Sequence, residues 1–275
     1  MMAITASQVN DLRKKTGAGM MDCKKALVEA DGDMDQAIDF LRKKGQKVAA
    51  KRGDNEAKEG LIFAESKGDT GYIIQFNCET DFVAKNSDFQ GFVKSIFETG
   101  IKAEVESVEE LKTLKFNEKL SVEEKIIEQV GVIGEKLELS NFAKVTATSV
   151  IAYNHPGNQL ATLVGLNKSG EEINDAGKQV AMQVAAMAPV ALNKDGISQE
   201  VIDRELQVGK DQAIEEGKPA DLADKIAQGR LNKFFKENTL LSQAFVRDNK
   251  LSVEKFLNSV ESGLTVTEFK RFSLS

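Results

Sequence analysis

The feature that most constrains the fold is an order of elements that occurs twice: two short strands joined by a turn, then a helix. In the first copy, Leu61–Glu65 and Tyr72–Phe76 flank the turn Lys67–Gly71. Their aromatic and β-branched residues are typical of strands. From Asp88 to Glu104, apolar residues recur at helical spacing, and a second helix is expected at Val122–Val130.

The second copy begins with Val145–Tyr153, a run rich in β-branched residues. The turn Asn154–Asn158 leads to the return strand Leu160–Leu166, and a helix is expected at Ile173–Met187. The alternating tail Leu264–Leu274 predicts a further strand that completes this sheet. The expected fold class is therefore α+β, with two similar core subdomains, each a small antiparallel sheet backed by helices.

The N-terminal residues 5–44 are expected to form three short helices. Gly17 ends the first, Gly32 ends the second, and Asp33 caps the third, which is expected to end at Gly45. So small a unit buries few residues and should be only marginally stable alone. We interpret it as a three-helix bundle similar to ubiquitin-associated domains.

Between Ser198 and Lys236 the pattern is purely helical, with one turn at Gly217–Pro219. This predicts an antiparallel helical hairpin inserted in the second subdomain. A short helix is expected at Val253–Val260, and the polar stretch 46–59 is interpreted as a linker region. The expected domains are the bundle at 1–53, a linker at 54–59, the first core subdomain at 60–142, the second at 143–196 and 237–275, and the hairpin insertion at 197–236.

Charge and composition argue against several classes of protein. The net charge of −6 disfavours a protein that mainly binds nucleic acid, although residues 1–53 carry +4. The basic end of that region is typical of a solvated helix terminus; it contains Arg42, Lys43, Lys44, Lys47, Lys51 and Arg52. No apolar run approaches the roughly 18 residues of a membrane span, and the N-terminus does not resemble a secretion signal. We therefore expect a cytoplasmic protein with no membrane or direct nucleic-acid partner.

The sequence offers little for catalysis. Its single histidine is His155, and its two cysteines, Cys23 and Cys78, match no metal-ligand spacing. Neither a phosphate-binding loop nor a dinucleotide fingerprint is present. We expect no enzyme activity, no cofactor and no metal site, while a thiol enzyme that uses Cys78 stays open as a weaker alternative.

The junction after the strand Tyr72–Phe76 carries the most distinctive residues. There, within Asn77–Asn86, Asp81 and Phe82 stand side by side before the next helix. Short loops on a rigid scaffold often carry functional groups. Local reasoning alone favours a plainer interpretation, in which Asp81 caps the helix and Phe82 enters the core.

Two segments favour a functional interpretation of Asp81 and Phe82 instead. The string TDFVAKN at Thr80–Asn86 and the segment Thr16–Leu27 closely resemble the bacterial elongation factor Ts family. Members of that family are guanine-nucleotide exchange factors for the GTPase elongation factor Tu. The resemblance implies the same role here, with elongation factor Tu as the partner, and it leaves open a dimer or a heterotetramer formed through the core or the helical hairpin.

The resemblance also implies which residues contact the partner. Thr80, Asp81, Phe82 and Val83 would dislocate the magnesium ion of the GTPase, with Phe82 as the wedge. Further contacts implied by the resemblance are Arg13, Met20, Met21, Ile133, Gly134 and His155; one of the two methionines is expected to lie in the core. The alternative function is a non-catalytic adaptor whose bundle recognises a different partner.

Overall fold

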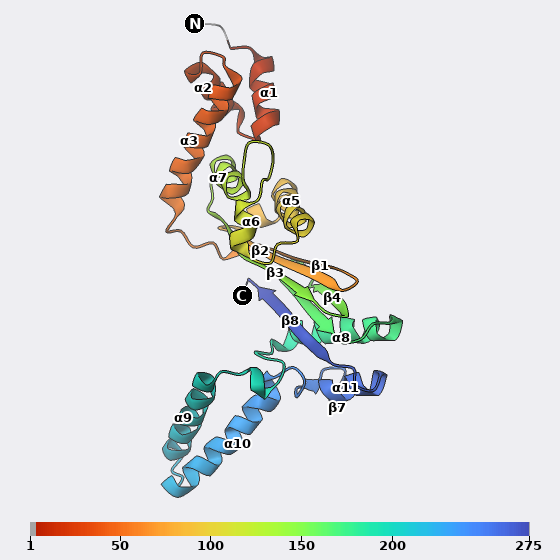
Figure 1. Cartoon of the computed structure of the whole chain (residues 1–275). Coiled ribbons are helices and arrows are strands. Elements are labelled where there is room, and N and C mark those ends of the chain that lie inside the picture. The colour runs from red at the N-terminus through yellow and green to blue at the C-terminus, as the bar shows by residue number, and fades with distance from the viewer. Residues whose placement is uncertain (1–3, 275) are drawn as a thin grey trace. The chain divides into compact units, whose positions relative to one another are not determined.

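The computed structural model describes residues 4–274, so residues 1–3 and 275, at the ends of two predicted domains, lie outside the described residues. The chain divides into two compact units. The second unit contains Ala64–Ile73 and Lys144–Phe272, and the first contains the other described residues. The fold is the α+β architecture that the sequence predicts, with an N-terminal helical bundle, small sheets and a helical hairpin (Figure 1).

The N-terminal bundle consists of three helices, and two of the predicted caps, Gly17 and Asp33, are present. These helices are α1 (Ala6–Thr16), α2 (Met20–Glu29) and α3 (Met34–Arg52). Thr5 caps α1, Gly17 ends it in the left-handed conformation, and the Asp33 side chain accepts a hydrogen bond from the Gln36 N–H. Side chains such as Leu12 and Cys23 are fully enclosed between the helices.

One helix end was predicted wrongly. The third helix does not stop at Gly45 but continues to Arg52, through residues interpreted as linker. Gly45 lies inside α3 because this helix packs closely on α7 (Val122–Ile133), where a Cβ on Gly45 would lie 3.0 Å from the Ile127 carbonyl oxygen. The glycine serves a close approach of two backbones rather than a helix terminus.

The first sheet has the strand order β1-β2-β3 and is covered by helices. Its strands are β1 (Glu59–Lys67), β2 (Thr70–Cys78) and β3 (Leu137–Thr146), and the helices after β2 are α4 (Asp81–Ala84), α5 (Ser87–Ala103), α6 (Val108–Thr113) and α7. Phe76 of β2 is fully buried and meets the Phe89 and Phe92 rings of α5 edge-on, with centroids 5.8 Å apart in both pairs. These contacts fix the end of β2, from which the candidate site begins.

The second sheet has the order β4-β5-β8, with the C-terminal tail as its third strand. The strands are β4 (Ser149–Asn154), β5 (Leu160–Leu166) and β8 (Val266–Ser273). Helix α8 (Glu171–Met187) packs on the sheet, α11 (Val253–Val260) packs on α8, and all of them contribute to one hydrophobic core. The predicted strand Val145–Tyr153 is wrong at its start, because Val145 and Thr146 end β3 and a bend separates them from β4. β3 therefore runs across the boundary predicted between residues 142 and 143.

The helical hairpin consists of α9 (Gln199–Glu215) and α10 (Ala220–Asn238). Small residues let the helices approach closely, since a Cβ on Gly209 would lie 3.2 Å from the Ala227 Cα atom. Arg230 of α10 pairs with Glu216 at the turn, at 2.7 Å. The turn of 3-10 helix η1 (Lys194–Gly196) precedes the hairpin, and the short strands β6 (Ala244–Phe245) and β7 (Asp248–Ser252) follow it.

Candidate functional site

Phe82 projects into solvent from a single helical turn at the end of β2. Thr80 is the N-cap of α4, and its hydroxyl accepts the Val83 N–H at 3.4 Å. The Phe82 side chain is 83% exposed. Both parts of the plainer local interpretation are therefore wrong, because the cap is Thr80 rather than Asp81 and the phenyl ring lies outside the core.

Asp81 stands beside the ring in the first turn of α4. Its carboxylate pairs with Lys85 one turn later, at 2.7 Å, and the hydrogen bond from Lys85 holds the pKa of Asp81 below its usual value. Both side chains of this pair are exposed to solvent. Asp81 is thus ionised at neutral pH and already has one intramolecular partner.

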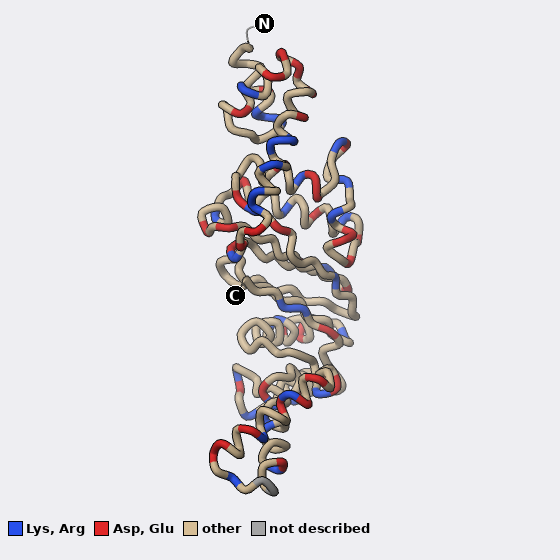
Figure 2. The backbone as a smooth tube through the Cα atoms, turned by 90° about the vertical axis from the view of Figure 1, so that its left-hand side faces the viewer, with Lys and Arg blue, Asp and Glu red and all other residues tan. Residues whose placement is uncertain are grey.

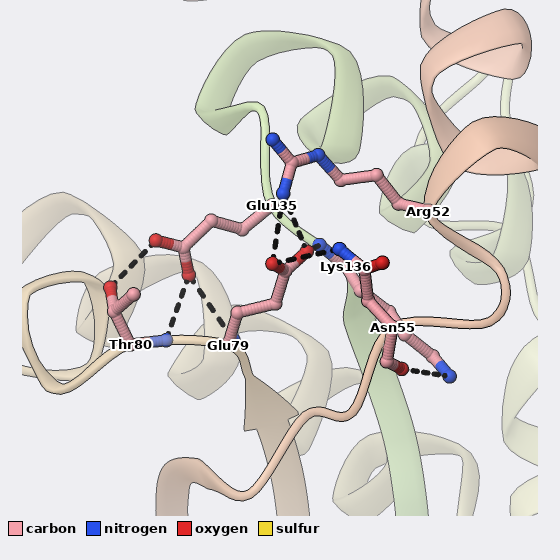
Figure 3. A network of polar contacts seen from close by, with 6 residues as sticks. All are labelled: Arg52, Asn55, Glu79, Thr80, Glu135 and Lys136. Atoms are coloured by element: carbon pink, nitrogen blue, oxygen red, sulfur yellow. Dashed lines mark hydrogen bonds and ion pairs between the residues drawn. The ribbon is translucent and has the colours of Figure 1, made fainter.

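The base of the turn is held by Glu135, which follows the end of α7. One Glu135 carboxylate oxygen accepts the Thr80 hydroxyl at 2.6 Å, and the other accepts the backbone N–H groups of Thr80 at 3.0 Å and Glu79 at 3.1 Å. Figure 3 shows this side chain reaching across to the start of the turn. A carboxylate with three donors forms the strong, charge-assisted type of hydrogen bond.

Glu79 makes the reciprocal contact. Its carboxylate accepts the backbone N–H of Lys136, the Arg52 guanidinium at 2.8 and 3.0 Å, and the Asn55 side-chain amide at 3.0 Å (Figure 3). Burial acts to raise the pKa of Glu79, but these hydrogen bonds and the Arg52 charge outweigh it, so the pKa is lowered. Arg52 is the last residue of α3, so the network also ties the bundle to the site.

A mainly apolar groove of about 770 Å³ opens beside the ring. Phe82 and Val83 form one wall, Ile133 belongs to another, and Gly17 of the bundle contributes from a third segment. Gly134 follows directly and ends α7 with a φ of 82°. The structure therefore brings together two of the predicted contact segments, 80–83 and 133–134.

A second groove, of about 630 Å³, lies on the bundle and is lined by Arg13, Met20 and Met21, together with Lys24. Both methionine side chains are exposed, at 60% and 64%. The expectation that one of them lies in the core is wrong, because the first turn of α2 turns Cys23 inward and leaves both methionines on the open face. Three predicted contact residues of the bundle thus share one apolar, positively charged surface.

His155 belongs to the second unit and lies exposed in the turn between β4 and β5. Its backbone N–H donates to the Leu160 carbonyl at 2.9 Å, and its ring nitrogen Nδ1 lies 2.9 Å from the Tyr153 hydroxyl. The side chain is accessible and oriented by its neighbour. It is therefore able to contact a partner through the other ring nitrogen.

The basic segment at the end of the bundle lies on α3, along which Figure 2 shows several Lys and Arg residues. Its cations are partly neutralised, since Lys44 pairs with Asp22 at 2.6 Å and Arg52 with Glu79 at 2.8 Å. This arrangement is typical of a helix that packs within its own chain. Among residues 4–274, no helix is long and apolar enough to cross a lipid bilayer.

The structure argues against the thiol-enzyme alternative. Cys78 is fully buried and its thiol donates to the Thr80 carbonyl at 3.2 Å. Burial, reinforced by the negative charge of Glu135, raises the pKa of the Cys78 thiol to about 12, whereas a nucleophilic cysteine needs a lowered pKa. In the described part of the chain, no three His, Cys, Asp or Glu side chains are grouped so that they could hold a metal ion.

Comparison with known proteins decides the family. The model of the family "Elongation factor TS" matches residues 79–275, beginning at Glu79, the residue before the N-cap of the turn that carries the exposed ring. The chain belongs to the elongation factor Ts family. It is therefore grouped with translation elongation factors, and the match includes Thr80–Val83, Glu135 and His155.

Curated elongation factor Ts proteins match along the whole chain, including the bundle that precedes the family-model match. The protein from Christiangramia forsetii is 53% identical over 100% of both chains, and that from Amoebophilus asiaticus is 50% identical over 98% of both. The Porphyromonas gingivalis protein is 44% identical over 100% of this chain and 99% of its own. The family assignment thus covers bundle, core and hairpin together.

Two site residues were missed by the sequence reasoning. Glu79 lies within the segment Asn77–Asn86, and Glu135 directly follows the predicted contacts Ile133 and Gly134, yet neither was given a role. The chain contains 43 acidic residues, and no local pattern distinguishes these two. Their importance follows from the neighbouring positions of β2 and β3 in one sheet, which brings the end of one strand to the beginning of the other.

Proposed function

We propose that this protein is a guanine-nucleotide exchange factor that binds the GDP form of elongation factor Tu and promotes GDP release. The observation that supports this most is Phe82, an apolar ring 83% exposed on a turn whose base is held by several hydrogen bonds. A large apolar side chain held out in water is costly for the free protein, and full burial of such a ring contributes about 1.5–3 kcal/mol. Membership of the family supports the same function.

The proposed action requires no covalent chemistry. A GTPase holds its nucleotide with a phosphate-binding loop and a magnesium ion, and magnesium demands near-ideal octahedral geometry. The Phe82 ring would insert between elements that support the magnesium ligands, with Asp81, Thr80 and Val83 shaping the contact. Displacement of these ligands weakens the binding of both the magnesium ion and the diphosphate. Exchange then follows because the factor binds the distorted form better than the GDP-bound form.

Coupling of this kind is reciprocal. If the factor lowers the affinity of the GTPase for nucleotide, then nucleotide lowers the affinity for the factor by the same ratio. GTP binding would therefore release the factor for another cycle. A factor that bound both forms equally would change nothing, however tight the complex.

Other residues would add further contacts to the interface. Ile133 and Gly134 would contact the partner next to Phe82, and Arg13, Met20 and Met21 would dock the bundle on the nucleotide-binding domain. Exposed Met side chains suit such a surface because they are apolar and adaptable. His155, accessible in its turn, is proposed as a contact nearer the phosphate side.

The deciding experiment loads purified elongation factor Tu with labelled GDP, adds excess unlabelled GDP, and follows release with and without this protein. An exchange factor accelerates release in proportion to its concentration until the complex saturates. An adaptor would bind without acceleration, which would reject the proposed function. A GTPase from outside translation, loaded in the same way, is the control for specificity.

A further inference from the structure

Helix α4, which carries Phe82, is too short to fix its own orientation. Helix α4 has four residues, Asp81–Ala84, and one helical turn is unstable without outside contacts. The ring itself is 83% exposed, so its own packing does not orient it either. Its direction must therefore be set by the groups that fix the base of the turn.

Glu135 supplies these contacts from another part of the chain, 55 residues away. It accepts both backbone N–H groups at the entry to α4 and also the Thr80 hydroxyl proton. Because that proton points to Glu135, the lone pairs of the hydroxyl are free to accept the Val83 N–H and close the cap. One carboxylate thus determines both where the turn begins and how its cap is arranged.

Glu79 and Glu135 form a reciprocal pair of contacts, which we call the clamp. Glu79 accepts the N–H of Lys136, while Glu135 accepts the N–H of Glu79. These side-chain bonds lie just beyond the ends of the neighbouring strands β2 and β3. Gly134, in the left-handed conformation, ends α7 and places Glu135 at this point. The two segments proposed to contact the partner, 80–83 and 133–134, are therefore held to each other by Glu79 and Glu135.

We infer that Glu135 is a positioning residue for nucleotide exchange, which orients the Phe82-bearing turn before the partner is bound. This inference rests on the proposed function. Such pre-organisation matters because the wedge acts only when it is aimed correctly, and a misplacement of about 1 Å at a reacting centre costs up to roughly a hundredfold in rate. A residue of merely structural importance would lower stability without changing how well the bound factor works.

The first test compares Glu135→Ala and Glu135→Gln with a matched control, Glu123→Gln, an exposed glutamate on α7. Labelled-GDP release from elongation factor Tu is measured over a range of factor concentrations. For Glu135→Ala we expect the maximal rate to fall about tenfold while the half-saturating concentration changes little. The maximal rate of Glu135→Gln should lie between those of Glu135→Ala and the unsubstituted protein, because its single amide oxygen cannot accept all three donors. The maximal rate of Glu123→Gln should equal that of the unsubstituted protein.

The second test measures the turn itself. The chain contains no tryptophan, so Phe82→Trp places a single fluorescent reporter at the tip. In the Phe82→Trp protein the exposed indole should rotate rapidly about its own bonds, and the residual nanosecond anisotropy should report the restricted motion of the turn that carries it. Adding Glu135→Ala should lower the residual nanosecond anisotropy by about half, with circular dichroism confirming that the fold is intact.

The two proposals can fail separately. If the unsubstituted protein does not accelerate GDP release, the exchange function fails, and the anisotropy measurement still decides whether Glu135 orders the turn. If it accelerates release and both Glu135 variants do so equally well, with unchanged anisotropy, the positioning role is rejected. If Glu135→Ala unfolds, the Glu135→Gln variant decides the question. A normal maximal rate together with normal anisotropy in Glu135→Gln would also reject the positioning role of Glu135.

Discussion

Gly45 of α3 and Gly131 of α7 meet backbone to backbone. A Cβ atom on Gly131 would lie 2.6 Å from the Cα atom of Gly45, a distance that real Cβ atoms essentially never show. The two glycines thus let the long helix of the bundle pack directly against α7 of the first core subdomain. Because α3 ends at Arg52, which binds Glu79, this contact also bears on the candidate site.

The first prediction concerns this contact. Gly131→Ala should force the helices apart and lower the free energy of unfolding by about 1–2 kcal/mol, since overpacking costs about 1–3 kcal/mol and the gain in helix propensity returns part of it. Gly229→Ala in α10 is the control, because nothing lies within 4 Å of its Cβ position. That variant should be slightly stabilised. Urea unfolding of both variants measures the effect, and equal shifts would contradict the close-packing argument.

Gly45 also illustrates how far helix ends can be predicted from sequence. Gly17 is the C-cap of α1, Gly32 lies two residues beyond the C-cap of α2, and a short helix was predicted at Val253–Val260, where the structure has α11. Gly45 was interpreted by the same rule and lies inside a helix. A glycine serves equally as a terminus or as a place of close approach, and only the partner helix, far away in sequence, distinguishes the two.

The same limit applies to the sheets and the site. The hairpins and the C-terminal strand follow from local alternation, but most of β3 was missed, because only its last two residues, Val145 and Thr146, belong to the run that was predicted as a strand. The importance of Thr80–Val83 came from the family resemblance, since an exposed and a buried Phe82 are locally indistinguishable. Glu135 contacts this turn only after β2 and β3 are paired, so no local pattern could predict its role.

The second prediction tests the wedge. Phe82→Ala should leave the fold intact, because the ring is exposed, and should reduce the maximal stimulated rate of GDP release about 10- to 100-fold, in line with about 1.5–3 kcal/mol for burial of the ring. Phe97→Ala is the contrasting variant, since that ring is buried against Phe142 and its loss costs about 3–5 kcal/mol of stability. A Phe82→Ala protein that released GDP at the unsubstituted rate would remove the basis of the mechanism.

The third prediction concerns the groove on the bundle. The double variant Met20→Ala, Met21→Ala should raise the half-saturating factor concentration about tenfold and leave the maximal rate unchanged, because these contacts serve docking alone. Val28→Ala is the control on the same helix, as Val28 is 50% exposed but does not line the groove. Release measured at saturating factor separates the two parameters. A loss of maximal rate would instead assign the methionines to the exchange step.

The fourth prediction follows from the lowered pKa of Glu79. Its folded-state pKa lies below the ordinary value of 4.5, so the ionised group stabilises the fold above about pH 4.5, and this contribution disappears as the pH falls through the folded-state pKa. The difference in free energy of unfolding between the unsubstituted protein and Glu79→Gln should therefore be largest near neutral pH and shrink in acid. Urea unfolding at a series of pH values measures it.

The control for this pH dependence is Glu56→Gln. Glu56 also pairs with a lysine, Lys58, but both side chains are 75% exposed, so solvent screens the pair and its loss should change stability little at any pH. A Glu79→Gln difference that stayed constant between neutral and acidic pH would show that the charge of Glu79 does not contribute to the clamp.

The fifth prediction uses the buried thiol beneath the site as a reporter of the turn. With a pKa of about 12, about one Cys78 in ten thousand is ionised at about pH 8, and the side chain is fully buried. Iodoacetamide should therefore leave Cys78 of the native protein unmodified for hours but label it rapidly in denaturant.

Because the Cys78 thiol donates to the Thr80 carbonyl and the Glu135 charge helps to raise its pKa, Glu135→Ala should speed the labelling of Cys78 in the native protein. Peptide mass spectrometry measures the rate at Cys78, with Cys23, buried in the bundle away from Glu135, as the internal control. Equal acceleration at both cysteines would indicate general unfolding rather than loosening of the turn.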